Sequence, residues 1–155
     1  MMSKKQKTES QQPPPWYASG LKFKCTGCGA CCTGSGRVWL NEQEIYNIAD
    51  LLKQDVSHLV EEAIERREGR WTLKENPQNG DCYFLSEQRC TIYQARPQQC
   101  QGFPWWPSTL KDQVSWDEAK RVCEGIDHLD AEHFSLNQIN EQLKLELESR
   151  KLWKR

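Results

Sequence analysis

The stretch CTGCGACC, residues 25–32, holds four of the eight cysteines of this 155-residue chain. Its C-x2-C-x2-C spacing brings three thiols together only if the backbone curls tightly, and Gly27 and Gly29 permit that curl. The same spacing holds iron–sulfur clusters in bacterial ferredoxins, where the fourth cysteine comes three residues later. Here Cys32 directly follows Cys31. Adjacent side chains usually point apart, so we do not expect these two to share a metal.

The other four cysteines are dispersed along the chain: Cys82, Cys90, Cys100 and Cys123. Cys82 and Cys90 lie in short runs of strand-forming residues separated by SEQR, which predicts a small β-hairpin. If Leu85 faces Cys90, a regular hairpin leaves Cys82 roughly 10 Å from Cys90. The two can then share a metal only if the hairpin is distorted. Eight thiols can form two four-ligand sites or one site with spare cysteines, and the spacing leaves both open.

Composition argues that these cysteines bind metal rather than form disulfides. The N-terminus has lysines but no apolar stretch after them, so we expect no secretory signal. A cytoplasmic chain lies among reducing thiols, where clustered cysteines usually bind metal. No apolar run approaches the length of a membrane span. The net charge of −1 gives no reason to expect nucleic-acid binding.

Two amphipathic helices are predicted after the cysteine loop. Asn41 is a good N-cap, and Glu44 is placed to complete a capping box. Asp55 can cap a second helix that ends near Gly69.

Two further helices are predicted in the C-terminal part. Ser115 and Glu118 read as a capping box that opens a short helix running through Cys123. Ser135 and Gln138 cap a long final helix. The apolar stripe of that final helix is Leu136, Ile139, Leu143 and Leu147.

These elements predict an α+β fold that is mainly α: a small irregular cysteine-rich domain with several helices and one short β-hairpin around a metal site. Residues 1–20, which are rich in Lys, Gln and Ser and end near three prolines, are expected to form a flexible tail. Residues 21–128 form the cysteine-cluster metal-binding domain. Residues 129–155 form the C-terminal helix.

Few other residues carry a chemical signal. With eight thiols available, none of His58, His128 and His133 is needed as a ligand. Arg96 can donate hydrogen bonds to cluster sulfurs or to a nearby carbonyl. It can equally serve only to shape the loop before Pro97. We find no catalytic triad pattern, P-loop or Rossmann glycine motif.

Four segments together resemble a known family: FKCTGCGACC, GDCYFL, RCTIYQARPQQCQGFPWWP and CEGI. They resemble the YkgJ-like cysteine-cluster proteins (CxxCxxCC), a zinc- or iron-chelating domain, over about residues 23–126. The resemblance implies that all eight cysteines hold a metal ion or an iron–sulfur cluster. The family usually has Arg where this chain has Gln101, and Pro where it has Glu124. Neither change removes a thiol, but a role that rests on that arginine does not carry over.

Three functional hypotheses follow. The first is a protein that holds an iron–sulfur cluster for electron transfer, iron handling or sensing, and the ferredoxin-like spacing favours it over zinc. The second is a zinc-bound interaction module, whose metal replaces a large core. The third is an accessory component of a modification enzyme, because some related chains are flagellin lysine methylases. The sequence leaves open whether the protein is catalytic.

Overall fold

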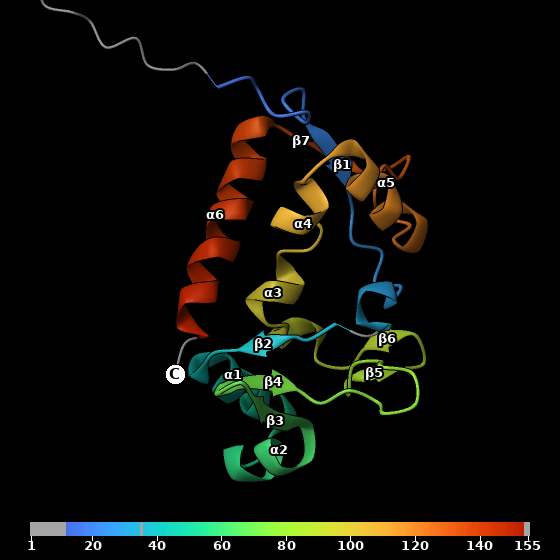
Figure 1. Cartoon of the computed structure of the whole chain (residues 1–155). Coiled ribbons are helices and arrows are strands. Elements are labelled where there is room, and N and C mark those ends of the chain that lie inside the picture. The colour runs from blue at the N-terminus through green and yellow to red at the C-terminus, as the bar shows by residue number, and fades with distance from the viewer. Residues whose placement is uncertain (1–11, 35, 154–155) are drawn as a thin grey trace, which may run out of the picture.

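The computed structural model describes residues 12–34 and 36–153. In that part of the chain, six α-helices accompany seven short strands in three small antiparallel sheets. Figure 1 shows the longest helix, α6 (Leu136–Leu152), running along one side of the molecule, so that it passes the elements at the two ends of the molecule. The predicted α+β class is confirmed, with three small sheets where one hairpin was expected.

The first half of the chain builds one end of the molecule. Asn41 caps the first helix: its side chain accepts a hydrogen bond from the Glu44 N–H at 2.8 Å, and a Glu44 carboxylate oxygen accepts one from the Asn41 N–H at 2.9 Å. The predicted capping box is therefore confirmed. The elements here are β2 (Trp39–Leu40), α1 (Glu42–Leu52), α2 (Val56–Ala63), β3 (Ile64–Arg67), β4 (Arg70–Leu73), β5 (Leu85–Ser86) and β6 (Arg89–Cys90).

The prediction that the second helix continues to Gly69 is wrong. Helix α2 ends at Ala63, and Ile64 already has extended backbone angles. Ile64 pairs with Leu73, so the following residues form β3 and pair antiparallel with β4. Gly69 lies in the turn between these strands with a φ of 75°. A partner strand downstream in the sequence, which local periodicity does not reveal, decides the conformation here.

The hairpin that carries two cysteines has the predicted register but is short. Leu85 pairs with Cys90, as expected, and each strand has only two residues. Cys82 bridges Glu75 instead of facing Tyr93. The Leu85 N–H donates to the Cys82 carbonyl at 2.9 Å, which closes a turn before the strand. The hairpin is therefore distorted at Cys82, which is the condition for Cys82 and Cys90 to share a metal.

The other end of the molecule contains most of the later helices. The prediction that Ser115 caps a helix is wrong, because the Asp112 side chain accepts a hydrogen bond from the Ser115 N–H at 2.8 Å and α5 begins at Gln113. The capping box of Ser135 and Gln138 is confirmed at the start of α6. The remaining elements are β1 (Leu21–Phe23), α3 (Gln98–Gln101), α4 (Pro107–Leu110), α5 (Gln113–Val122) and β7 (Glu132–Phe134).

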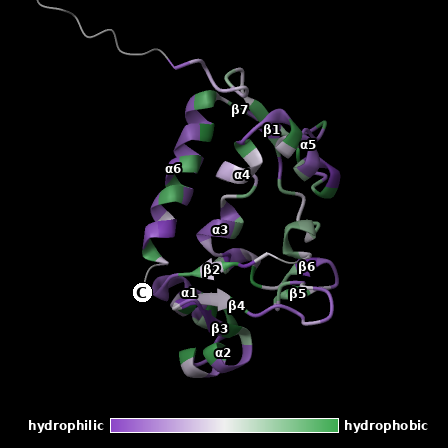
Figure 2. Ribbon diagram, in the orientation of Figure 1, coloured by the Kyte–Doolittle hydropathy of each residue, from purple (hydrophilic) through white to green (hydrophobic). Residues whose placement is uncertain are grey.

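Two separate hydrophobic clusters hold these two ends. One contains Leu40, Ile48, Leu59 and Ile92, with Cys82 and Cys90 packed against it. The other contains Trp105, Trp116 and Ile139, with Cys123 packed against it. In Figure 2, α6 alternates hydrophilic and hydrophobic residues along its length, and its buried positions include Glu146 and Ser149 beside Ile139. The cysteines therefore lie where the two clusters meet.

The structure differs from the sequence prediction near both ends of the described chain. Within the segment predicted as a tail, Trp16 packs on Trp116 and its indole N–H donates to the Leu110 carbonyl at 2.7 Å. The rest of the predicted tail, residues 1–11, lies outside the described residues. The predicted apolar stripe of α6 is wrong at Leu147, which is 45% exposed, while its neighbour Glu146 is buried. None of the helices in residues 12–34 and 36–153 has the length and apolar character needed to cross a membrane.

Replacing Gly125 with Ala should destabilise the fold. The added Cβ would collide with the Lys24 carbonyl, where the Lys24 N–H also donates to the Gly125 carbonyl at 3.0 Å. Overpacking of this kind costs about 1–3 kcal/mol, which urea unfolding would measure. Gly36→Ala is the matched control, because its Cβ would meet open space. Equal unfolding midpoints for the two variants would contradict the close approach.

Candidate metal centre

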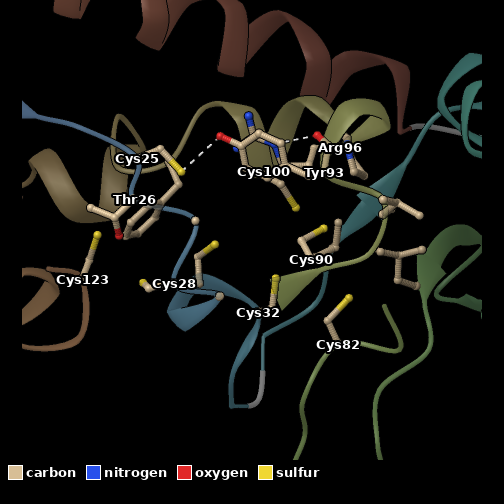
Figure 3. Close-up of a pocket in the computed structure, with 18 of the residues that line it drawn as sticks. Cys25, Thr26, Cys28, Cys32, Cys82, Cys90, Tyr93, Arg96, Cys100 and Cys123 are labelled. Carbon is tan, nitrogen blue, oxygen red and sulfur yellow. Dashed lines mark hydrogen bonds between the residues drawn. The ribbon is translucent and has the colours of Figure 1, made fainter. Parts of the chain in front are cut away.

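All eight cysteines line a single cavity (Figure 3). They come from the cysteine loop (residues 25–32), the hairpin, α3 and the residue after α5. The cavity has a volume of about 60 Å³, several times the roughly 10–15 Å³ that one water needs. Segments almost a hundred residues apart in the sequence thus present sulfur to the same small space.

The cysteine loop is positioned by its glycines and by the hairpin. Gly27 and Gly29 both have left-handed backbone angles, with φ of 72° and 75°. A Cβ on Gly29 would collide with the Gln88 carbonyl, so only glycine lets the loop lie against the hairpin turn. The Cys82 N–H donates to the Cys32 carbonyl at 2.8 Å, which holds the end of the loop against the segment just before the hairpin.

The start of the loop is tied instead to the segment around Cys123. The Thr26 hydroxyl donates to the Glu124 carboxylate at 2.6 Å. Phe23 bridges Ile126 just before the loop begins. The loop therefore contacts distant cysteine segments at both of its ends.

The Cys31, Cys32 and Cys90 thiols lie close enough to change one another's pKa. Although adjacent side chains usually point apart, the turn at Ala30–Cys32 leaves both Cys31 and Cys32 lining the same cavity. Hydrogen bonding with Cys31 and Cys90 raises the Cys32 pKa, and hydrogen bonding with Cys32 lowers the pKa of Cys31 and of Cys90. The centre therefore favours thiolate at two positions, as metal ligation requires.

The remaining distant cysteines are held as neutral thiols by burial. Burial is the largest influence on Cys82, Cys100 and Cys123, and it raises the pKa of each. Backbone N–H groups two residues ahead oppose this effect by donating to sulfur: Phe84 to Cys82, Ile92 to Cys90 and Gly125 to Cys123. Such donors orient ligands and tune a metal or cluster.

Tyr93 and Arg96 cover the cavity beside Cys25. The Tyr93 hydroxyl donates to the Cys25 sulfur at 3.4 Å, and the Arg96 guanidinium lies 3.8 Å over the Tyr93 ring. Arg96 also donates to the Tyr93 carbonyl at 3.0 Å, which is one of its two predicted hydrogen-bonding roles. Its charge helps to lower the pKa of Cys31 and Cys90. The sequence reasoning missed Tyr93; its place three residues before Arg96, in the segment between Cys90 and Cys100, was the available signal.

The histidines lie elsewhere, and none of the three lines the cavity. His58, on α2, is 3.3 Å from Glu62. His128 accepts a hydrogen bond from the Asp130 N–H at 3.1 Å, and His133 lies 3.0 Å from the Ser19 carbonyl.

The donor set fits a thiolate-preferring metal, such as zinc or the iron of an iron–sulfur cluster. With the side chains as they stand, no three His, Cys, Asp or Glu residues of the described chain form a group that could hold a metal ion. The eight sulfurs therefore share one cavity without forming a closed coordination shell.

Residues 24–124 match the family model CxxCxxCC, described as a "putative zinc- or iron-chelating domain". The chain belongs to this family. The matched region contains all eight cysteines that line the cavity. Membership in CxxCxxCC supports metal binding, with zinc or iron as the metal. No solved structure matches the chain.

In the metal-free, reduced and folded protein, iodoacetamide should modify Cys31 faster than Cys100 at neutral pH. The thiolate is the reactive form; the Cys32 hydrogen bond lowers the pKa of Cys31, whereas burial raises that of Cys100. Peptide mass spectrometry over a time course measures both rates. In urea the two rates should converge. Equal rates in the folded protein would contradict the opposite pKa shifts of Cys31 and Cys100.

Proposed function

We propose that this CxxCxxCC protein holds iron–sulfur clusters through its eight cysteines, in the reducing cytoplasm, and serves electron transfer, iron handling or sensing. The single observation that carries the proposal is the convergence of all eight thiols on one cavity. Iron is favoured over zinc by the ferredoxin-like spacing of the cysteine loop. The N–H and O–H groups that donate to sulfur support the same choice, because such bonds tune cluster potentials.

We assign the eight cysteines to two sets of four, guided by their contacts. The outer set is Cys25, Cys28, Cys31 and Cys123. Three of its members come from the loop and are exposed. Cys123 is tied to the loop through Thr26 and Glu124, and charge on Cys28 and Cys31 raises the Cys123 pKa further after burial.

The inner set is Cys32, Cys82, Cys90 and Cys100. The Cys32 thiol influences the pKa of Cys90, and the Cys32 carbonyl accepts from the Cys82 N–H. After burial, charges on Cys31, Cys82 and Cys90 raise the Cys100 pKa further. Each set offers four thiolates, which is the ligand number of a [4Fe–4S] cluster or of a structural zinc. Cys31, beside Cys32, lies at the boundary of the two.

A structural zinc site is the second candidate, and one observation favours it. The cavity lies between two small hydrophobic clusters that each pack against different cysteines. A metal there would join the two clusters, and its binding energy would be folding energy. In this alternative the protein is an interaction module, with no redox role.

The decisive measurement is metal and sulfide content, with an absorption spectrum, after purification without oxygen. We expect a brown protein that contains iron and inorganic sulfide. Colourless protein with zinc and no sulfide would reject the cluster and leave the zinc alternative.

Cysteine variants test the division into two sets. Cys28→Ser should lose the outer metal and keep the inner one, because a serine oxygen is a poor match for a soft metal. Cys90→Ser should show the reverse. His58→Ala is the control and should keep all metal, since His58 lies away from the cavity.

Metal content per chain, with the spectrum of what remains, measures each variant. Full occupancy in Cys28→Ser would refute its assignment as a ligand. Complete loss in both cysteine variants would show one shared site in place of two.

A further inference from the structure

The outer and inner sets of cysteines differ in how far solvent reaches them. Cys25, Cys28 and Cys31 of the outer set are exposed, whereas all four members of the inner set are partly buried. A Cβ on Gly27 would meet nothing within 4 Å, so the loop faces open space at this point. Because the surroundings of a metal site control what can reach it, water and competing ligands have readier access to the outer sulfurs.

An exposed tyrosine contacts the outer set. The Tyr93 hydroxyl donates to the Cys25 sulfur at 3.4 Å, and Figure 3 shows the two side chains joined by this bond. Tyr93 lines the cysteine cavity and is also 43% exposed, so it lies where the cavity meets solvent. A donor to a ligand atom fixes the direction from which that atom can bind a metal.

Neighbouring residues restrain Tyr93 in this position. Ile92, the residue before it, is buried in one of the two hydrophobic clusters. The Arg96 guanidinium lies 3.8 Å over the Tyr93 ring, and its Nε donates to the Tyr93 carbonyl at 3.0 Å. Arg96 is itself restrained, because its carbonyl accepts from the Gln101 side chain at 2.7 Å. The phenol therefore reaches Cys25 from a support that does not depend on the loop.

Tyr93 acts on the outer set more selectively than Arg96 does. The charge of Arg96 opposes the rise in the Cys100 pKa and helps to lower the pKa of Cys31 and Cys90, so it is felt in both sets. The Tyr93 hydroxyl donates to Cys25, a member of the outer set. Removing this hydroxyl alone is therefore the change that separates the two sets.

We propose that Tyr93 is a positioning residue for Cys25, and that it sets how firmly the outer set holds its metal. The outer set is then the exchangeable site of the centre, and the inner set is the permanent one. Among the roles proposed above, such a pair of sites suits iron handling best, because the outer set can give up metal while the inner set keeps its own. The inference rests on the proposed metal centre and its two sets, and it holds for iron and for zinc.

The test is metal release from the full-length protein loaded with Cd²⁺, a thiolate-preferring probe metal, after addition of excess EDTA. EDTA takes the metal ion, and the freed thiolates take protons from solvent. We expect a fast phase from the outer set and a slow phase from the inner set. The fast phase should be absent in Cys28→Ser, which identifies its source.

Tyr93→Phe keeps the ring and removes only the hydroxyl. This variant should speed the fast phase by roughly tenfold or more, the usual effect of losing a partner of a metal ligand. The slow phase and the circular dichroism should stay as in the parent. Cadmium NMR gives a second readout, in which the signal of the outer site moves and that of the inner site does not.

Tyr83→Phe is the matched control. Tyr83 is 47% exposed, close to the value for Tyr93, and it does not line the cysteine cavity. Release from this variant should follow the parent in both phases. An unchanged fast phase in Tyr93→Phe, or an equal speeding of both phases, would overturn the proposal.

Failure of this proposal is distinct from failure of the metal centre. Release of all Cd²⁺ in a single phase would reject the exchangeable outer site and leave metal binding intact. A chain that takes up no Cd²⁺ would reject the centre, and this proposal with it. Iron and sulfide analysis of protein purified without oxygen decides the identity of the metal separately from either result.

Discussion

The contact between the cysteine loop and the hairpin is the constraint on which the rest of the structure depends. Each hydrophobic cluster is small, and the space between them is lined by eight thiols together with apolar side chains such as Phe23, Leu73 and Phe103. Gly29 must be glycine for the loop to approach the hairpin, and the Cys82 N–H then binds the Cys32 carbonyl. The segments that carry the thiols therefore take part in joining the two ends of the molecule.

Bound metal would offset the unfavourable ionisation of these buried thiols. Burial keeps Cys82, Cys100 and Cys123 protonated by raising the pKa of each, while the Cys32 proton is drawn toward two neighbouring sulfurs. Within the cavity lining, Arg96 is the one arginine or lysine that faces these groups. A metal cation replaces the thiol protons, so its affinity should rise with pH. The backbone N–H groups aimed at sulfur would then stabilise the ligated thiolates.

The sequence predicted several features that depend on hydrogen bonds between nearby residues. The capping boxes at Asn41 and Ser135 are correct, whereas the equally local box predicted at Ser115 is wrong because Asp112, three residues earlier, caps α5 instead. The Leu85–Cys90 register is correct because a short turn fixes it. The helix predicted to reach Gly69 failed because β4, a separate segment, captures Ile64. That all eight cysteines meet could be expected from the family resemblance, but the division into sets depends on contacts such as Thr26 to Glu124 that no local pattern contains.

The short helix α3 lines two cavities. Cys100 lines the cysteine cavity, while its neighbour Gln99 lines an open pocket beside Trp39 and Trp106. Buried carboxylates lie at both ends of this helix: Glu44 accepts from the Gln98 N–H at 2.8 Å, and Glu146 packs near Gly102. The hydrogen bond from α3 to Glu44 of α1, together with packing against α6, holds a helix of four residues in place more than its propensity does. A change at Gln99 reaches Cys100 through one peptide link, so the position of α3 is the physical quantity that the two cavities have in common.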